Sequence, residues 1–390
     1  MRILTALTYY APHISGLSVY ARRLVRRLVE RGHAVTVLTS HFQPDLPRRE
    51  QIDGAAVVRS PVLLSLSKGV VMPAFPWQAA RLLAEHDLLY LHLPQLEASV
   101  AAVLAKVSHK PIVVSYQCDI QLPNGPARWT MTPAIRLSHY LTGKLADRIV
   151  VTSEAYGWRA RLSRHFHQKV TWVYPPVELA AGEDSAAFRA RHGLSDGPLV
   201  GFVGRFSEEK GIEYLIDAVP RVLRDVPNAR FVLAGPTDAV PGEHVVDRLQ
   251  PVIDGLGDRW LHLGRLSDPE LTAFYEMIDV LVLPSTNSTE AFGMTQVEAM
   301  LAGTPVVATD MPGVSEAVRV TGMGRLVPPR DGAALAEAIV AVLRDRAAYT
   351  RPASEIRARF DPEATADFYE RLFADLVGEA ERAPVTAAHD

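Results

Sequence analysis

The stretch DVLVLPSTNSTEAFGMTQVEAMLAGTPVVAT, residues 279–309, sets the fold class of the chain. A run of Val and Leu is followed by a polar loop, an amphipathic segment of helical spacing and a second valine-rich run. Strand, helix and strand in this order form the unit of parallel sheets, because two parallel strands need a crossover between them. The pattern therefore predicts an α/β fold whose buried strands are covered by helices on both faces.

Similar apolar runs occur on both sides of this unit. They predict strands at 2–8, 34–40, 55–60, 88–92, 111–116, 147–153 and 170–175, and then at 198–204, 229–235, 260–264, 279–285 and 304–309. A chain of 390 residues is too long for one ordinary core. We therefore predict two doubly wound, Rossmann-like domains that face each other across a cleft, with the ligand beyond the carboxyl ends of the strands.

Composition places the domain limits. We expect residues 1–178 to form the first domain, 179–197 a linker after a double proline, and 198–360 the second domain. Residues 361–378 have the apolar spacing of one further amphipathic helix, and residues 379–390 are expected to be disordered.

Hydrophobic residues make up 48% of the chain and charged residues 22%, which is typical of a globular protein and not of a disordered one. The single cysteine excludes an internal disulfide framework and favours a reducing compartment. The sequence has no signal peptide pattern at MRILTALTYY and no apolar run of about 18 residues. We therefore expect a cytoplasmic protein.

The two halves carry opposite charge. Residues 1–178 hold 21 Lys and Arg against 11 Asp and Glu, whereas the remainder holds 20 against 33. This asymmetry predicts that the first domain faces an anionic partner, either a membrane surface or a phosphorylated acceptor. The alternative is that its basic residues are scattered over a solvated surface. No base-stacking module accompanies them, so we do not expect nucleic acid.

Several common chemistries have no signature in this sequence. GxGxxG, the Walker-type GxxxxGK[ST], a DxD pair, zinc-spaced His and Cys, and the GxSxG elbow are all missing. The sequence therefore predicts neither a dinucleotide cofactor nor a metal site.

Two segments carry charged residues where α/β sheets present their ligands. In GFVGRFSEEKG, residues 201–211, Arg205 follows a strand and Lys210 precedes a helix, which suits them to hold a diphosphate. In the opening stretch a helix starts near Gly293, where free backbone amides can bind an anion. Glu290 and Glu298 flank this start. Their separation is too large for a glycosidase pair and favours hydrogen bonds to two parts of one polyhydroxylated ligand.

The spacing Glu290-x7-Glu298 followed by AMLAGTPVVATDMPGVSEAV, together with GRFSEEKG, resembles the retaining glycosyltransferases of the GT-B fold, specifically glycosyltransferase family 4. The likeness covers nearly the whole chain, from YYAPHISGLSVYARRLVRRLVERGHAVTVLTS to the last helix. It implies that the last helix returns to the first domain. It also implies metal-independent hexose transfer from a UDP- or GDP-linked sugar to a lipid or saccharide acceptor, in cell-envelope or glycoconjugate biosynthesis, with no cofactor.

The resemblance also implies roles for individual residues. Arg205 and Lys210 hold the donor diphosphate, and Glu290 contacts the sugar hydroxyls. Glu298 takes the ribose hydroxyls, and Gly16 allows the phosphate to approach the first domain. The resemblance further implies backbone contacts to the donor at two places. The backbone of Phe292, Gly293 and Met294 lies beside the sugar, and that of Arg265 and Leu266 in HLGRL (262–266) lies beside the base.

The chain departs from the family pattern at two positions. Ser15 precedes Gly16 where paired glycines are usual, although its hydroxyl can donate to a phosphate. Gln117 stands where members often place a histidine near the donor sugar, and an amide cannot titrate near neutral pH. If the leaving phosphate itself takes the acceptor proton, in a front-face reaction, Gln117 can still position a sugar hydroxyl. Otherwise the protein binds nucleotide sugar without turnover.

Candidates on the acceptor side are less specific. His13, His92 and Tyr10 lie at strand ends or in loops of the first domain and are candidates to touch the acceptor, although structural packing is an open alternative. The helix at 18–32 carries Arg22, Arg23, Arg26 and Arg27 on one side, which fits anionic headgroups at the inner face of a membrane as well as a solvated helix. A same-fold epimerase or phosphorylase is the other enzymatic alternative.

Overall fold

The computed structural model describes residues 1–66, 69–119, 126–194, 197–236 and 245–382. It divides the chain into two compact units. Unit 1 combines Met1–Pro176 with Pro362–Asp390, and unit 2 is Val177–Asp361.

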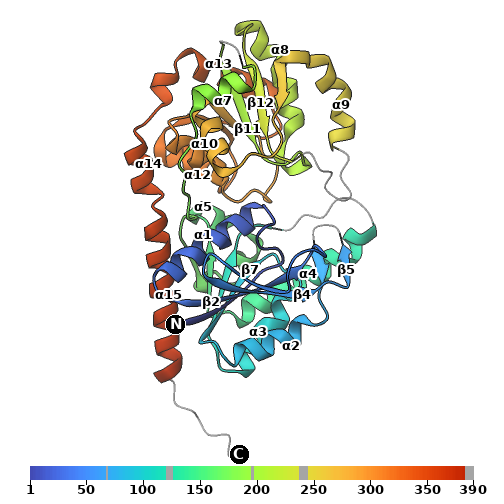
Figure 1. The fold of residues 1–390 in the computed structure, drawn as a ribbon, viewed down its shortest axis with the longest axis vertical. Helices are drawn as coiled ribbons and strands as arrows, with labels where there is room; N and C mark the ends of the chain where they lie inside the picture. Colours follow the sequence, from blue (N-terminus) through green and yellow to red (C-terminus); the bar gives the residue numbers. More distant parts are fainter. Residues whose placement is uncertain (67–68, 120–125, 195–196, 237–244, 383–390) are drawn as a thin grey trace, which may run out of the picture. The chain divides into compact units, whose positions relative to one another are not determined.

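Unit 1 is built on an eight-stranded sheet, with the strand order β10-β9-β8-β7-β1-β2-β4-β3 (Figure 1). All neighbouring strands are parallel except β3 and β4, which are antiparallel. The strands are β1 (Arg2–Ala6), β2 (Ala34–His41), β3 (Arg49–Ile52), β4 (Ala55–Pro61), β7 (Leu88–Leu93), β8 (Ile112–Tyr116), β9 (Arg148–Val151) and β10 (Val170–Trp172). A small antiparallel pair, β5 (Leu64–Leu66) and β6 (Gly69–Val71), lies outside this sheet.

Helices cover both faces of this sheet, as expected for a doubly wound fold. One face carries α1 (Gly16–Glu30) and the last helix, α15 (Pro362–Arg382); the other carries α2 (Phe75–Leu83), α3 (Ala98–Val107) and α4 (Pro126–Leu145). The short helices α5 (Glu154–Arg159) and α6 (Arg161–His165) and the 3₁₀ turn η1 (His167–Lys169) connect β9 to β10. The expected return of the last helix to the first domain is confirmed.

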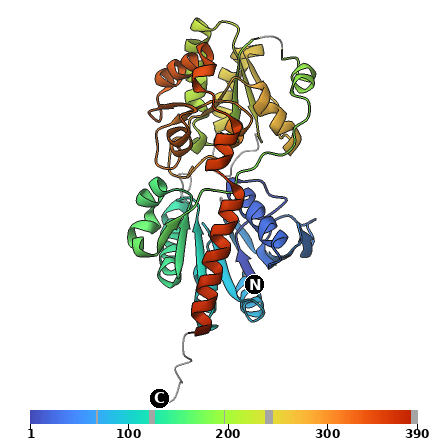
Figure 2. The same cartoon turned by 90° about the vertical axis from the view of Figure 1, so that its left-hand side faces the viewer.

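The helix α15 is held on unit 1 by an aromatic contact and an ionic one. The hydroxyls of Tyr20 and Tyr369 are 2.8 Å apart in the buried interior. At the surface Arg31 donates to Glu363, at 2.7 Å, and to two further carboxylates of α15. These contacts explain why residues so distant in sequence share one unit, and Figure 2 shows α15 lying lengthwise over this face.

Unit 2 contains a six-stranded parallel sheet in the order β13-β12-β11-β14-β15-β16. Its strands are β11 (Leu199–Val203), β12 (Arg230–Ala234), β13 (Trp260–His262), β14 (Val280–Leu283), β15 (Val306–Thr309) and β16 (Gly324–Val327). Its helices are α7 (Ser185–Arg191), α8 (Ile212–Asp225), α9 (Val245–Leu256), α10 (Asp268–Met277), α11 (Met294–Leu301), α12 (Glu316–Thr321), α13 (Gly332–Arg344) and α14 (Ala353–Arg359), with 3₁₀ turns η2 (Glu208–Lys210), η3 (Gly257–Arg259) and η4 (Arg346–Tyr349).

Three local expectations need correction. The segment 179–197 was expected to be a linker, but it holds α7, because Asp184 caps the first amides of that helix and Phe188 is buried. The last helix continues to Arg382, so residues 379–382 are ordered; residues 383–390 lie outside the described residues. The polar edge strand β3 and the short strands β5, β6 and β16 were not predicted from the sequence.

Candidate functional site

An ion pair joins two strand ends at the centre of the sheet of unit 2. Nζ of Lys210, the last residue of η2, is 2.5 Å from Oε2 of Glu290, in the loop between β14 and α11. The two side chains are only 20% and 15% exposed. Strands β11 and β14 are neighbours from which the chain winds in opposite directions along the sheet. The pair therefore lies at the topological switch point, where open α/β sheets bind ligands.

The loops after β11 and β14 are packed closely enough to form this pair because one position is glycine. Gly211 has φ +65°, and a Cβ at this position would collide with the carbonyl oxygen of Pro284. Thr286 then ties the loops together: its amide donates to Glu209 O at 2.9 Å and its hydroxyl to Glu208 O at 3.0 Å. The separation of Lys210 and Glu290 is thus fixed by backbone contacts.

Arg205 follows the part of the backbone that the Lys210 side chain approaches. The side chain of Lys210 crosses the backbone at Gly204, with its Cε 3.6 Å from where a Cβ of that glycine would stand. Arg205 follows directly, and its guanidinium is 3.8 Å from a carboxylate oxygen of the buried Glu209. The end of β11 therefore presents two cations, each with a carboxylate neighbour that orients it.

Gly293 is the N-cap of the helix α11, and its φ of +77° is in the left-handed region. A Cβ here would collide with side-chain atoms of Leu283 and Gln296. The fully buried Gln296 holds the turn by donating to Phe292 O at 2.9 Å and to Val314 O at 3.0 Å. Because the first amides of a helix have no partners inside it, the turn at Met294 provides an anion-binding group next to Glu290.

Glu298 lies one turn into α11 and is only 5% exposed. The hydroxyl of Tyr275, on α10, donates to its Oε2 at 2.8 Å. Tyr275 is itself buried, and its carbonyl oxygen accepts a 2.7 Å bond from Thr304. The orientation of Glu298 is therefore set from a second helix.

The end of β13 lies close to the end of β11. Gly235, after β12, has φ +139°, and a Cβ on it would collide with Gly204 O. Its amide donates to Gly264 O at 2.8 Å, directly before the exposed Arg265 and the half-buried Leu266. The strand ends that carry Arg265, Arg205 and Glu290 thus form one continuous edge of unit 2.

In unit 1, Ser15 is the N-cap of α1 and Gly16 is its first residue. Ser15 has φ −150°, an extended conformation that any residue adopts, which explains why glycine is not required there. Its hydroxyl accepts the Ser18 amide at 3.2 Å in a capping box. Gly16 is exposed, and nothing lies within 4 Å of where its Cβ would stand.

Gln117 follows β8 and is only 8% exposed. Its Nε2 is 3.2 Å from His92 Nδ1 and 3.3 Å from Ser115 Oγ. His92 is fully buried, and burial lowers its pKa from 6.5 to about 3, so the imidazole is neutral. The structure therefore places His92 in the interior, in contact with Gln117.

The other two acceptor-side candidates lie in the loop after β1. His13 stacks on Tyr9, with ring centroids 4.6 Å apart, and both rings meet the edge of Phe42. Tyr10 is fully buried, and burial raises the pKa of its hydroxyl. Of these candidates, His13 is the more accessible.

The arginines of α1 form ion pairs in the structure. Arg22 pairs with Asp53 at 2.7 Å, Arg26 lies 3.7 Å from Glu30, and Arg27 pairs with Glu363 of α15. Arg23 also takes part in an interaction. The guanidiniums of Arg22 and Arg27 thus link α1 to neighbouring elements of unit 1.

The described residues provide neither a metal-binding cluster nor a membrane-spanning helix. No group of three or more His, Cys, Asp or Glu side chains is arranged to hold a metal ion. Within the same ranges, no helix has the length and apolar character that crossing a bilayer requires.

Of the predicted site residues, Arg205, Lys210 and Glu290 lie at the carboxyl edge of the sheet of unit 2. Three further residues of this region were not predicted from the sequence. Glu209 was predictable from the sequence, since it is four residues from Arg205 in the same motif. Gln296 and Tyr275 were not predictable, because their roles depend on hydrogen bonds to Val314 O and to Glu298 that sequence spacing does not reveal.

Comparison with known proteins matches most of the chain. A family model described as Glycosyltransferase Family 4 covers residues 14–181, and one described as Glycosyl transferases group 1 covers residues 197–345. A 2-deoxystreptamine glucosyltransferase of Streptomyces kanamyceticus is 30% identical over 85% of this chain and 90% of its own length. The phosphatidyl-myo-inositol mannosyltransferase of Mycobacterium tuberculosis is 27% identical over 99% of this chain and 100% of its own.

Among solved structures, Anabaena HepE in complex with UDP-glucose superposes with a TM-score of 0.74 at 22% identity. The match covers 96% of this chain and all of that one. At this identity the likeness concerns the fold.

Proposed function

Since this chain belongs to glycosyltransferase family 4 and is a glycosyltransferase of the GT-B fold, we propose that it moves a hexose from a nucleotide diphosphate sugar to a lipid or saccharide acceptor. The transfer retains the anomeric configuration and uses no metal ion. The observation that carries the proposal is the 2.5 Å pair of Lys210 and Glu290 at the switch point of unit 2. Arg205 and the start of α11 flank this pair.

In this proposal the diphosphate lies between the cations and the helix start. Arg205 offers a fork of donors, Lys210 a point charge, and the amides after Gly293 further hydrogen bonds. As the bond to the sugar breaks, negative charge develops on the leaving phosphate, where fixed donors stabilise it most. Lys210 then bridges the phosphate and Glu290.

Glu290 accepts hydrogen bonds from the sugar hydroxyls, and Glu298, oriented by Tyr275, accepts those of the ribose. The bond from the sugar C1 to the phosphate oxygen breaks while the acceptor oxygen bonds to C1 on the same face. The acceptor proton passes to the leaving phosphate oxygen. This route needs no titrating side chain at Gln117, whose amide positions a sugar hydroxyl.

The acceptor class is suggested by the relatives. The mycobacterial relative is named for a phosphatidylinositol acceptor, whereas the Streptomyces relative is named for 2-deoxystreptamine. The first matches this chain over its whole length, and unit 1 has a basic excess, with 23 Lys and Arg against 17 Asp and Glu. We therefore propose a lipid acceptor at the inner, cytoplasmic face of a membrane, with unit 1 on the acceptor side.

A thermal-shift series with UDP-, GDP- and ADP-sugars tests the donor, because a ligand that binds only the folded state raises its melting temperature. The stabilising sugar is then incubated with lipid and saccharide acceptors, with and without EDTA, and the product anomer is assigned by NMR. We expect one nucleotide to stabilise, EDTA to have no effect and the donor anomer to be retained.

Each alternative has its own outcome in this series. Stabilisation without turnover on any acceptor supports a nucleotide-sugar-binding protein with no activity. A changed free nucleotide sugar supports an epimerase, and phosphate-dependent cleavage supports a phosphorylase. No shift with any nucleotide sugar contradicts the proposed site.

A further inference from the structure

Exposed apolar side chains are distributed unequally between the units. The described part of the chain has fourteen large hydrophobic residues with exposed side chains, and all except Val252 belong to unit 1. Seven of them come from α3 and α4. Soluble surfaces normally carry such residues singly, whereas a group on adjacent elements indicates a contact surface.

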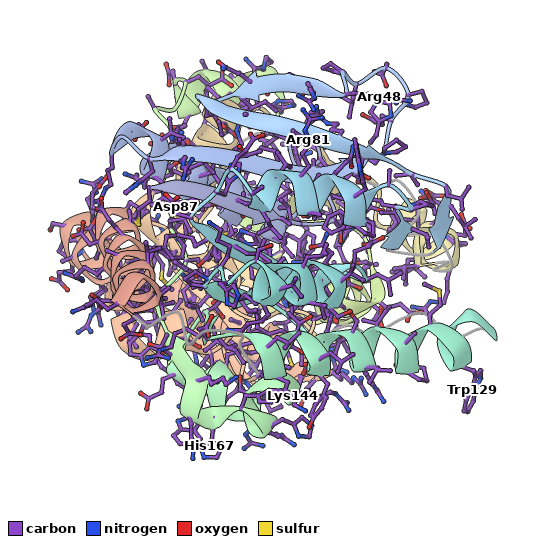
Figure 3. All side chains as sticks on the ribbon, turned by 90° about the horizontal axis from the view of Figure 1, so that it is seen from below. Arg48, Arg81, Asp87, Trp129, Lys144 and His167 are labelled. Atoms are coloured by element: carbon purple, nitrogen blue, oxygen red, sulfur yellow. The ribbon has the colours of Figure 1, made fainter. Side chains whose placement is uncertain are left out.

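These seven residues form one face, which we call the α3–α4 face. The two helices are in contact, since Ser138 Oγ of α4 is 3.0 Å from Ser99 Oγ and 2.7 Å from Leu96 O, at the start of α3. The two helices lie side by side in Figure 3, and helical spacing places the exposed side chains of each helix along one of its sides. The face consists of Val100, Val103, Val107, Trp129, Leu137, Tyr140 and Leu141.

The charge around this face has a single sign. Neither α3 nor α4 contains an Asp or Glu. Residues 98–169 hold ten Lys and Arg against three Asp and Glu. The exposed Arg136 and Lys144 border Leu137, Tyr140 and Leu141 and form no ion pair with the described residues, and Trp129 and Lys144 are labelled on α4 in Figure 3.

The positive charge continues beyond α4. The α6 helix packs on α4 through Gly143, where a Cβ would be 2.7 Å from the ring of Phe166 and 2.9 Å from Leu162. The exposed Arg161 and Arg164 of α6 extend the basic border. Of the three acidic residues, Asp147 is engaged by Lys106 at 2.7 Å and by the Ile112 amide at 2.7 Å.

Apolar side chains bordered by unpaired cations match the surface of an anionic bilayer. Trp and Tyr favour the level of the headgroups, aliphatic side chains enter the acyl boundary, and Lys and Arg remain at the lipid phosphates. A second copy of the chain fits less well, because two such faces would bring two sets of cations together with no carboxylate on α3 or α4 to balance them. Charge complementarity thus selects the lipid.

We propose that the α3–α4 face of unit 1 docks on anionic lipid bilayers. The inference deepens the proposed function, and it rests on that function for its purpose, which is to bring unit 1 to a lipid acceptor. The docking surface is the sheet face opposite to α1, whose arginines are engaged in intramolecular pairs.

The test is co-sedimentation of the full chain with vesicles of phosphatidylcholine and phosphatidylglycerol, and with phosphatidylcholine alone, without nucleotide sugar or acceptor. We expect binding to the anionic vesicles that weakens as salt is raised. Arg136→Gln with Lys144→Gln should reduce it by about 25-fold, since each cation near such a surface contributes about fivefold. Leu137→Ser with Leu141→Ser should reduce it at least tenfold on the same vesicles.

The matched control is Arg221→Gln with Arg224→Gln, which removes the same charge from the exposed side of α8 in unit 2 and should leave binding unchanged. Equal binding of the α4 variants and the parent overturns the proposal. So does binding that is independent of phosphatidylglycerol, or a dimer in light scattering that the Leu137/Leu141 variant abolishes. Turnover on a detergent-dispersed acceptor is measured separately, so the loss of docking and the loss of the proposed reaction are distinguishable.

Discussion

The two units share a doubly wound sheet but differ in what they place at its carboxyl edge and on its exterior. Unit 2 has paired charges at that edge, Lys210 with Glu290 and Arg205 with Glu209. Unit 1 has a neutral, buried group there, with His92 in contact with Gln117. Outside, unit 1 exposes apolar side chains among cations, whereas the described part of unit 2 has one exposed large hydrophobic residue.

This difference fits the two kinds of ligand proposed for the two units. A small polyanion needs a few charged groups held at fixed separations, which unit 2 provides through glycine-mediated loop contacts. A surface or a lipid needs area and long-range attraction, which unit 1 provides through helix faces.

The largest effect is expected when one of the paired charges at the carboxyl edge of unit 2 is removed. Lys210→Ala should lower kcat by about 10²–10³-fold, because it removes a fixed cation from the leaving diphosphate. Steady-state kinetics measure this, and circular dichroism verifies the fold. Arg221→Ala, a cation on the exterior of the same unit, is the matched control and should be silent.

A loss of folding has to be separated from a loss of chemistry in this variant. Lys210→Ala leaves the half-buried Glu290 without its partner, which by itself destabilises a protein. The double variant Lys210→Ala with Glu290→Gln removes that carboxylate charge, so it should recover stability without recovering turnover. Near-normal kinetics in Lys210→Ala would falsify the assigned role.

The second prediction concerns acid stability and targets unit 1. Burial lowers the pKa of His92 to about 3 and that of His139 to about 4, both below the unfolded value of 6.5. The unfolded chain therefore binds protons first as the pH falls. The stability of unit 1 should be complete above about pH 6.5 and decrease below it, by about 1.4 kcal/mol per pH unit for each histidine.

Melting temperatures between pH 7.5 and 5 measure this slope. In His92→Gln the slope should decrease by the contribution of one histidine, whatever the stability of the variant at neutral pH. The exposed His109→Gln is the control and should keep the slope of the parent. An unchanged slope in His92→Gln means that His92 takes up its proton in the folded state, contrary to its burial.

The sequence predicted the buried parallel strands of both units but not the elements that depend on distant contacts. The strands were readable because buried parallel strands are uniform apolar runs, as in VLVL of β14 and VVAT of β15. The polar strand β3 and the helix α7 were missed because their stability depends on pairing with β4 and on burial of Phe188, which local pattern does not show.

The candidate site follows the same rule. Lys210 and Glu290 are 80 residues apart, and their places after two strands predicted a shared ligand site but not the ion pair between them. The arginines of α1 were read as a basic face because their partners lie elsewhere: Asp53 after β3, and Glu363 on the last helix. Ion pairs between distant elements are invisible to spacing along one helix.

A third prediction sharpens the description of the donor edge. Tyr275→Phe removes one hydroxyl that donates to Glu298, a hydrogen bond to a charged group. We expect KM for the nucleotide sugar to rise about tenfold with little change in kcat, because the ribose contact is made equally in ground and transition states. Tyr214→Phe, on α8, is the control. A fall in kcat without a rise in KM would instead place Glu298 at the reacting centre.

The smallest expected effect concerns whether unit 1 contributes to binding of the donor. Gly16→Ala has no steric cost, since nothing lies within 4 Å of the new Cβ, and alanine favours a helix start. We expect unit 1 to melt at the same temperature or slightly higher, while KM for the donor rises a few-fold because the methyl group keeps the phosphate away.

Gly235→Ala in unit 2 is the counterpart, because φ is +139° and the Cβ would collide with Gly204 O. It should destabilise unit 2 by about 1–3 kcal/mol or more. Both variants are compared by thermal melting and by donor KM. If Gly16→Ala leaves KM unchanged while Gly235→Ala raises it, the donor is held by unit 2 alone, and the contrast between the units is sharper than the family resemblance implies.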